Sequence, residues 1–219
     1  MIEKQQFIVI GLGVFGATIA RELTRLGHDV LGVDSNEAKV DDLAEEITHA
    51  VIADVTRENA LKDLDAGSYD VGIVAVGHNA EAAILATMYL RDLGVEEVWS
   101  EARSRQYARI LERMGATRVI TPESELGIMV AEELNYPMVN NFITLGDDEI
   151  VVEIIVSENL DGVAVSELLS DDPTESAFLL VKRGSKTHLK PPDSFRLKVD
   201  DRAIVAGPLS ELRRLADRI

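Results

Sequence analysis

Short apolar stretches alternate with longer amphipathic stretches along the first part of the chain. The apolar stretches are rich in valine, isoleucine and alanine and have few polar interruptions. Parallel strands, which crossover helices cover on both faces, have this nearly continuous apolarity. We therefore predict strands at residues 6–11, 29–34, 49–54, 71–76, 97–102 and 118–122.

The stretches between these strands have apolar residues three or four positions apart, which is the spacing of one helix face. Helices are therefore predicted at residues 16–27, 36–47, 58–65, 79–94, 104–115 and 123–135. Gly27, Gly94 and Gly115 end three of them, as expected where a left-handed residue closes a helix. This order predicts a Rossmann-like α/β fold with a six-stranded parallel sheet.

The pattern changes after the sequence NYPMVNN at residues 135–141. Residues 142–219 contain about four strand-like stretches with one or two helices, and they have no glycine-rich loop. We predict a nucleotide-binding domain over 1–135, which ends in a crossover helix at 123–135, and a smaller α+β domain over 142–219. Exposed valines and isoleucines of residues 150–156 are predicted to contact a second copy.

Composition narrows the class of protein and its partners. Of 219 residues, 39 are acidic and 22 are lysine or arginine, which gives a net charge of −17. This charge argues against a nucleic-acid partner, because nucleic acids are bound through basic surfaces. The absence of cysteine excludes disulfides and thiolate metal sites. With no apolar run of about 20 residues and no leader-like N-terminus, we expect a soluble cytoplasmic protein.

Gly11, Gly13 and Gly16 form a G-x-G-x-x-G motif directly after the first predicted strand. In this context the glycines allow a tight turn, the approach of a diphosphate, and close packing of the helix, whose positive N-terminal end faces the phosphates. Asp34 ends the next strand, 18 positions after Gly16. A carboxylate there accepts hydrogen bonds from ribose hydroxyls and repels a 2′-phosphate. The motif predicts a nucleotide site, and the alternative is a glycine turn that only packs a helix on a sheet.

Other predicted nucleotide contacts lie at the carboxyl ends of the strands, where ligands bind in such sheets. Asp54 ends the third strand and either lies near the adenine or caps the next helix through Thr56. After the fourth strand, a small residue and a glycine leave room for a ligand. The remaining members of the predicted set around these positions are Val14, Phe15, Ser35, Val55, Ala75, Val76, Gly77 and Asn79.

The sequence favours a binding module over an enzyme. Of the four histidines, only His78 lies in a loop at the predicted ligand edge. No Tyr-x-x-x-Lys pair, metal-ligand cluster or nucleophile elbow is present. The second domain is also too small to be a substrate domain of a dehydrogenase. The alternative is a small NAD-dependent oxidoreductase that uses His78 as its acid or base.

Several segments resemble the RCK (also called KTN) regulatory subunits of bacterial Ktr and Trk potassium uptake systems. They are IGLGVFG, the pair Val33–Asp34, HAVIADVTREN at 49–59, IVAVGHNAEA at 73–82 and RILERMGATRVITPESELG at 109–127. The resemblance implies a non-enzymatic, cytoplasmic subunit, peripheral on the inner face of the membrane. It also implies dimers that form a homo-octameric ring beneath a membrane-embedded potassium channel or transporter subunit. Exchange of ATP for ADP, or binding of NAD(H), would then change the gate, and the alternative is an RCK module that serves another cation channel or exchanger.

The resemblance also assigns roles to four further positions. Ktr-type members typically have an arginine at the position of Val14 and a lysine near that of Glu101, so both differences disfavour a triphosphate. Arg103 stands at about the place of a Trk-type arginine that contacts the nucleotide, although a surface ion pair is the alternative. Glu123 matches a glutamate that holds a divalent cation, Mg²⁺ or Ca²⁺, near the nucleotide. Its alternative is an acid that favours the start of a helix.

Overall fold

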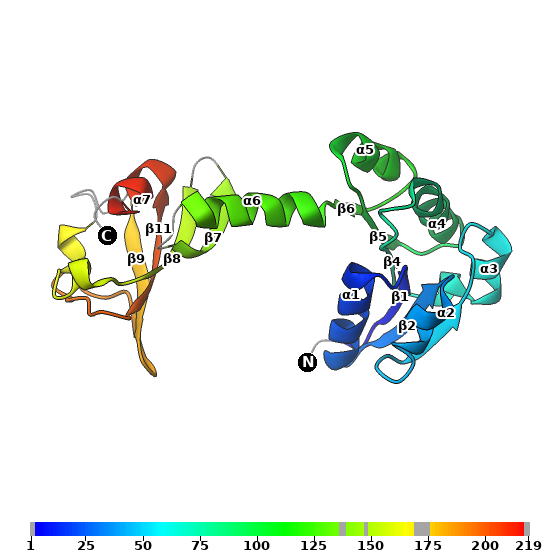
Figure 1. Cartoon of the computed structure of the whole chain (residues 1–219), viewed down its shortest axis with the longest axis horizontal. Helices are drawn as coiled ribbons and strands as arrows, with labels where there is room; N and C mark the ends of the chain where they lie inside the picture. Colours follow the sequence, from blue (N-terminus) through cyan, green and yellow to red (C-terminus); the bar gives the residue numbers. More distant parts are fainter. Residues whose placement is uncertain (1–2, 136–138, 147–148, 169–175, 217–219) are drawn as a thin grey trace. The chain divides into compact units, whose positions relative to one another are not determined.

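The computed structural model describes residues 3–135, 139–146, 149–168 and 176–216 (Figure 1). The chain divides into two compact units, Met1–Glu125 and Leu126–Ile219. The division falls inside helix α6 (Pro122–Asn135). The helix begins at Pro122, and Glu125 in its first turn accepts hydrogen bonds from the N–H and hydroxyl of the preceding Thr121 at 3.1 Å each.

The first unit contains a parallel sheet of six strands, which confirms the predicted Rossmann-like fold. The strands run in the order β3-β2-β1-β4-β5-β6. The chain therefore moves outward from β1 to β3 and returns to place β4 against β1. Ligands of such sheets bind at this change of direction, at the carboxyl ends of the strands. The strands are β1 (Gln6–Ile10), β2 (Asp29–Asp34), β3 (His49–Ile52), β4 (Val71–Val74), β5 (Glu97–Glu101) and β6 (Arg118–Ile120).

Helices follow the first five strands, as predicted. They are α1 (Val14–Arg25), α2 (Glu37–Asp41), α3 (Glu58–Asp63), α4 (Ala80–Asp92) and α5 (Arg105–Arg113). Gly27, Gly94 and Gly115 follow α1, α4 and α5 with φ of 95°, 99° and 104°. They thus have the left-handed conformation that the sequence predicted for these helix ends.

Helix α2 is shorter than predicted, because the helix expected over residues 36–47 stops at Asp41. Residues 42–46 continue as turns, with bonds such as Ala44 N–H to the Asp41 carbonyl. Four of the six residues in 41–46 are acidic. Negative charges repel one another and the negative end of a helix, so a continued α-helix is disfavoured there. Leu43 and Ile47 still bury their side chains.

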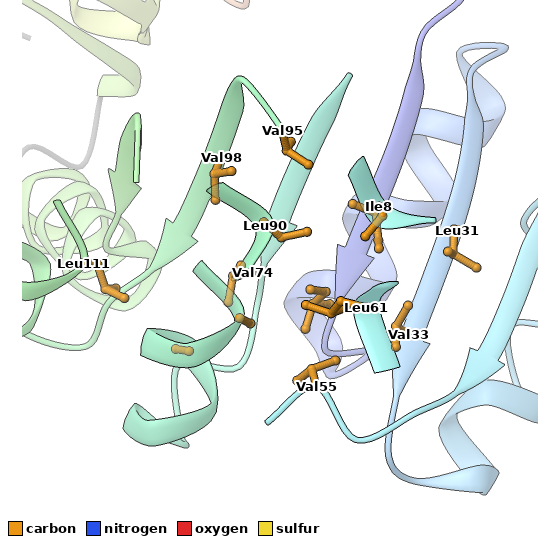
Figure 2. Packing of buried hydrophobic residues seen from close by; sticks show 14 of the residues in the cluster. Ile8, Leu31, Val33, Val55, Leu61, Val74, Leu90, Val95, Val98 and Leu111 are labelled. Atoms are coloured by element: carbon orange, nitrogen blue, oxygen red, sulfur yellow. The ribbon is translucent and has the colours of Figure 1, made fainter. Parts of the chain in front are cut away.

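Side chains on alternate positions of the strands form two core layers. Ile8 and Ile10 of β1 belong to the layer that packs against α3, α4 and α5. Figure 2 shows Ile8 in this layer, together with Leu61 of α3 and Leu90 of α4. Phe7 and Val9 belong to the layer that contains residues of α1 and α2. This alternation holds because successive side chains of a strand point to opposite faces of the sheet. Both faces are therefore apolar, as the sequence predicted.

The second unit contains a five-stranded antiparallel sheet in the order β10-β9-β11-β8-β7, with helix α7 (Leu209–Ala216) in contact with β11. The prediction of about four strands is thus one short. The strands are β7 (Val139–Gly146), β8 (Glu149–Ile155), β9 (Ala177–Arg183), β10 (Lys186–Leu189) and β11 (Arg202–Pro208).

The apolar residues of 150–156 are mainly core residues of this unit. Ile150, Val152, Ile154 and Val156 are buried within its own hydrophobic cluster. Of the apolar residues between them, Ile155 is 42% exposed. Burial alternates along β8, although the apolar sequence does not, because one face of the strand is covered and the other is not. Most of the valines and isoleucines that were expected to be exposed are therefore buried in the chain's own core. For the exposed Ile155, contact with a second copy stays a prediction.

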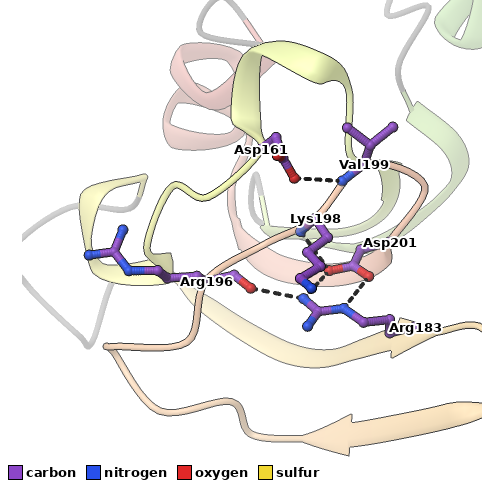
Figure 3. Close-up of polar contacts among 6 residues, drawn as sticks. All are labelled: Asp161, Arg183, Arg196, Lys198, Val199 and Asp201. Carbon is purple, nitrogen blue, oxygen red and sulfur yellow. Dashed lines mark hydrogen bonds and ion pairs between the residues drawn. The ribbon is translucent and has the colours of Figure 1, made fainter.

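A buried ion pair joins the sheet of the second unit to a neighbouring loop (Figure 3). Asp201 is 1% exposed and accepts hydrogen bonds from Arg183 Nε and Nη2 at 2.8 and 2.6 Å. It also accepts from the Lys198 N–H at 2.9 Å, and Arg183 donates to the Arg196 carbonyl at 2.8 Å. Burial raises the pKa of Asp201, but the hydrogen bonds from Arg183 and Lys198 outweigh it and keep the pKa below its ordinary value.

Candidate functional site: a nucleotide pocket at the glycine loop

The loop between β1 and α1 is shaped by two close backbone approaches. Gly11 has φ of +93°, and a Cβ there would lie 2.6 Å from the Ala75 carbonyl oxygen. A Cβ on Gly16 would lie 1.9 Å from the Gly11 carbonyl oxygen. Both glycines are thus required by the packing of the loop against β4 and of α1 against the loop. These positions have the structural roles that the motif predicts.

Gly13 differs from the other two glycines, because a Cβ there would meet no protein atom within 4 Å. Gly13 is the N-cap of α1, and no side chain caps the first amides of this helix. The first N–H groups of a helix lack partners within the helix and carry its positive end. Open space beside uncapped amides is what an anionic group requires, so Gly13 marks the place where a phosphate fits.

Asp34 holds the glycine loop as well as facing the pocket. Its Oδ2 accepts from the Leu12 N–H at 2.8 Å and from Lys39 Nζ at 3.1 Å, and its Oδ1 accepts from the Asn36 N–H at 2.9 Å. The side chain is 7% exposed. Burial raises the pKa of Asp34, but these hydrogen bonds and the charge of Lys39 outweigh burial and keep the pKa below its ordinary value. The carboxyl is therefore ionised at neutral pH.

A pocket of about 260 Å³ lies at the carboxyl ends of β1, β2, β3 and β4. It brings together eight of the predicted site residues, namely Gly11, Asp34, Ser35, Asp54, Val55, Thr56, Val76 and Asn79. Ile10, Val33, Asn36, Lys39, Ala53, His78 and Ala82 complete the lining. The pocket combines apolar walls with polar groups at its rim, which suits a nucleoside with its ribose hydroxyls.

Asp54 is exposed and binds its near neighbour Thr56. Its Oδ1 accepts from the Thr56 hydroxyl at 2.6 Å and from the Thr56 N–H at 3.1 Å. These two hydrogen bonds lower the pKa of Asp54. The cap of α3 is Arg57, which makes no side-chain cap bond. Of the two alternatives for Asp54, the helix cap is therefore not present, and the Asp54–Thr56 turn lies at the pocket.

The turn after β4 is built from small residues and one cap. Ala75 lies beneath the glycine loop, 3.0 Å from where a Cβ of Gly16 would stand. Asn79 is the N-cap of α4, and its Oδ1 accepts from the Ala82 N–H at 3.1 Å. Gly77 is buried, and its N–H points to the Glu101 carboxylate at 3.4 Å. Ala75 and Gly77 are thus small because neighbouring groups fill the space around them.

Glu101 is a buried acid at the end of β5. It is 8% exposed, and a Cβ on Gly77 would lie 2.6 Å from its Oε1. No cation forms an ion pair with this carboxylate within the part of the chain that the structure describes. Glu101 lies on the β5 side of the glycine loop. Its carboxylate has no cationic partner, so it repels a negative charge that a ligand places nearby.

The other predicted residues lie outside the pocket lining. Val14 begins α1 and is 90% exposed, so it offers its backbone N–H but no charge. Phe15 turns its side chain into an apolar groove of about 500 Å³, which also includes Ile19 and Trp99. Arg103 is exposed and makes no ion pair among the described residues. Because it is not held in place, its contact with a nucleotide stays a prediction.

Glu123 lies in the first turn of α6 and is exposed. In the described residues, no group of three histidine, cysteine, aspartate or glutamate side chains is placed to hold a metal ion. Glu123 by itself does not fit a Mg²⁺ or Ca²⁺ site, which needs several oxygen ligands. Its role as a metal ligand therefore stays a prediction.

Lys39 was not among the predicted site residues. It is the only lysine or arginine among the residues that line the pocket in the described part of the chain. Its Nζ is 3.1 Å from Asp34 Oδ2. The signal was its place as the third residue of α2, which is separated by two residues from the strand that ends at Asp34. Together with the α1 amides, Lys39 gives the pocket some positive potential against its two carboxylates. The arrangement can bind an adenine nucleotide with its diphosphate on the α1 amides.

No helix in the described ranges has both the length and the apolarity to cross a membrane.

The sequence matches known proteins over nearly all of its length. Residues 7–122 match the sequence model of the TrkA-N domain family. Ktr system potassium uptake protein A of Bacillus subtilis is 36% identical over 97% of this chain and 96% of its own. The protein of the same name from Vibrio alginolyticus is 36% identical over 95% and 94%, and Ktr system potassium uptake protein C of Bacillus subtilis is 31% identical over 99% and 98%.

Solved structures share the fold. The RCK domain of GsuK superposes with a TM-score of 0.67 at 16% identity, over 100% of this chain and 48% of that one. The GsuK channel bound to NAD gives a TM-score of 0.65 at 16% identity, over 98% and 39%. The present chain thus spans less than half of each of these two chains. The NAD(P)-binding domain of an exopolyphosphatase-related protein from Archaeoglobus fulgidus is 26% identical, with a TM-score of 0.53 over 60% of this chain and 98% of that one.

Proposed function

This chain belongs to the RCK regulatory subunits of bacterial Ktr and Trk potassium uptake systems, and we propose that it senses an adenine nucleotide and thereby gates a membrane-embedded potassium channel or transporter subunit. The observation that carries the proposal is the space in front of Gly13. The loop is packed tightly at Gly11 and Gly16 but is open at the uncapped amides of α1. A diphosphate bound there explains why a glycine stands at the one position of the motif where the protein itself does not need it.

The nucleotide lies, in this proposal, across the first four strands. The diphosphate binds the N–H groups of Gly13 and Val14, the ribose hydroxyls face Asp34 and Lys39, and the adenine enters the pocket beside Val55. Relatives in fold support an adenine nucleotide, because GsuK structures are bound to NAD and to ADP. We propose ATP, ADP or NAD(H) as the ligand. Glu123 would bind a divalent cation near the nucleotide only if other groups, such as the phosphates of the nucleotide, supplied the remaining oxygen ligands.

Regulation rather than turnover is supported by the relatives, which are proteins of potassium uptake systems. A ligand changes a two-state protein only by binding one state more tightly than the other. We propose that the nucleotide does so in a homo-octameric ring of dimers, and that this cytosolic ring is held at the inner face of the membrane by its channel subunit. A change of nucleotide then changes the shape of the ring and the state of the gate.

The test is the identity and location of the bound nucleotide. The purified protein is denatured and any released nucleotide is identified by mass spectrometry, and ATP, ADP and NAD⁺ are titrated by calorimetry. We expect one adenine nucleotide per chain. A Gly13→Ala variant is expected to lose binding at least tenfold, since a methyl group would stand where the phosphate lies. Wild-type protein that binds none of the three nucleotides would overturn the proposal.

A further inference from the structure

One flexible side chain already binds the carboxylate that the ribose is proposed to face. Lys39, the third residue of α2, lines the same pocket as Asp34, and its Nζ donates to Asp34 Oδ2 at 3.1 Å. The side chain of Lys39 is 35% exposed, whereas that of Asp34 is 7% exposed. The ammonium group thus has access to solvent that the carboxylate largely lacks.

The acceptor positions of Asp34 are nearly all in use. A carboxylate has about four such positions, two on each oxygen. Oδ2 accepts from the Leu12 N–H at 2.8 Å and from Lys39, and Oδ1 accepts from the Asn36 N–H at 2.9 Å. About one position, on Oδ1, therefore remains for a ligand.

A ribose needs more than one such position. Its 2′ and 3′ hydroxyls are two donors on neighbouring carbons, and each needs its own acceptor if one carboxylate is to bind both. With Lys39 in place, Asp34 has room for one of them. The second hydroxyl can bind Oδ2 only where a donor that is already there gives up its position.

Lys39 decides whether Oδ2 is open to the second hydroxyl. The other donor on this oxygen, the Leu12 N–H, belongs to the tightly packed glycine loop. The Asn36 N–H on Oδ1 is likewise a backbone group. Among the donors to Asp34 that the structure describes, Lys39 is thus the one that a side-chain substitution removes.

The ammonium group keeps its place against a hydroxyl. Its hydrogen bond to the carboxylate is charged at both ends, whereas that of a ribose hydroxyl is charged at one end. In the part of the chain that the structure describes, Lys39 is the cation that pairs with Asp34. Because a buried carboxylate without a cation is costly, the exchange of Lys39 for a hydroxyl would lose more than it gains.

We propose that Lys39 restricts Asp34 to one hydroxyl of the bound ribose, and that it is therefore a specificity-determining residue of the nucleotide site. The inference rests on the proposed function and goes beyond the glycine motif, which predicts the acid but not its partner. One hydroxyl binds Oδ1, and the other stays hydrated. The pocket then holds its ligand less tightly than a carboxylate that binds both hydroxyls would, and it tolerates the loss of the second hydroxyl.

Nucleotides that differ by one hydroxyl test this directly. ADP, 2′-deoxy-ADP and 3′-deoxy-ADP have the same charge, so the attraction of the pocket for phosphates cancels in the ratios of their affinities. Each is titrated by calorimetry into the full-length wild type and into Lys39→Met, which keeps a long side chain and removes the ammonium group. Lys62→Met is the matched control, because Lys62 pairs with Glu58 on α3 and is not part of the pocket lining. Circular dichroism shows whether each variant is folded.

In the wild type, we expect the loss of one hydroxyl to weaken binding about tenfold, since a bond to a charged acceptor is lost, and the loss of the other to change it less than about twofold. In Lys39→Met, both losses should weaken binding about tenfold, because Oδ2 is then open to the second hydroxyl. Lys62→Met should have the wild-type ratios.

Two results overturn the inference while nucleotide binding still supports the proposed function. One is a wild type in which the two deoxynucleotides have equal effects, whether large or absent. The other is a Lys39→Met variant that keeps the wild-type ratios. Wild-type protein that does not bind ADP, ATP or NAD⁺ is a failure of the proposed function instead, and the inference fails with it.

Discussion

Asp34 connects the sequence motif to the geometry of the loop. The motif predicts an acid for the ribose, and the structure adds that this acid already accepts three hydrogen bonds, one of them from Leu12 inside the glycine loop. A carboxylate has about four acceptor positions. Asp34 therefore has capacity left for one strong bond to a ribose hydroxyl, and it positions the loop for the phosphates at the same time.

Asp34→Asn keeps the size of the side chain but removes its charge and its ion pair with Lys39. We expect nucleotide affinity to fall by about 1–3 kcal/mol, since a charged acceptor is lost at the ribose. Asp29→Asn, at the opposite end of β2, is the matched control and should leave affinity unchanged. Calorimetry with ADP measures both. Unchanged affinity in Asp34→Asn would mean that the ribose is bound elsewhere.

Glu101→Gln tests whether the buried carboxylate penalises additional phosphates. Removal of a negative charge that has no cationic partner should favour ATP by about 1 kcal/mol relative to NAD⁺. Glu97→Gln lies on the same strand, where Glu97 accepts from the Trp99 indole at 2.7 Å, and serves as the control. Competition between ATP and NAD⁺ in calorimetry gives the ratio. A ratio unchanged in Glu101→Gln, or shifted toward NAD⁺, would contradict this role.

At the scale of elements, the glycine loop separates folding from binding. Gly16→Ala would place a Cβ 1.9 Å from a backbone oxygen, whereas Gly13→Ala meets no protein atom. We expect Gly16→Ala to lower the free energy of unfolding by more than about 2 kcal/mol. Gly13→Ala should lower it by less than about 1 kcal/mol and still lose nucleotide binding. Urea denaturation and calorimetry distinguish the two effects, and equal losses of stability in both variants would contradict the assigned roles.

The buried pair between Asp201 and Arg183 gives the second unit a pH-dependent stability. The pKa of Asp201 is lowered in the folded protein, so its contribution is complete above the unfolded value of about 3.9 and is lost as the pH falls through the folded value. Asp201→Asn should therefore destabilise this unit by about 1–3 kcal/mol at pH 7 and make little difference at the lowest pH. Asp200→Asn, at an exposed neighbour, is the control. The free energy of unfolding of wild type and variant is measured by urea denaturation at several pH values. A difference between them that does not shrink at low pH would contradict this role of Asp201.

The sequence was sufficient for the elements whose pattern is local. The strands of the first sheet are continuous apolar runs, and Gly27, Gly94 and Gly115 have the positive φ that a helix end requires. Helix α2 was predicted too long because apolar spacing continues through Leu43 and Ile47 while repulsion among its acids does not appear in that spacing. The inward-facing residues of β8 were expected to be exposed, because a nearly continuous apolar run does not say which of its side chains the unit itself covers.

The site was predictable in its backbone and less so in its side chains. Gly11, Asp34 and Asp54 follow from the ends of strands in a known topology. Lys39 reaches Asp34 only through the position of α2, and the burial of Glu101 depends on contact with Gly77, 24 positions away in the sequence. Such contacts are set by tertiary packing, which spacing along the chain does not encode. Whether Arg103 and Glu123 contact the nucleotide also depends on groups beyond their own elements.

At the scale of the molecule, the chain combines a nucleotide pocket in its first unit with a second unit that has its own sheet and core. In the proposed function, the pocket reports a ligand and an assembly of copies transmits its occupancy to the channel subunit. A mechanical response requires both, because a change at one loop affects a channel only through subunits that move together. The net charge of −17 makes separate molecules repel one another, which favours solubility.

Potassium flux under nucleotide control is the measurement that tests the central claim most directly. The chain is purified together with the membrane subunit that accompanies it in its own cells, the complex is placed in liposomes, and potassium flux is recorded without nucleotide and with ATP, ADP or NAD⁺. The account predicts that flux depends on the nucleotide with the wild-type chain and does not with Gly13→Ala. Flux that is the same with and without every nucleotide for the wild-type chain would contradict it.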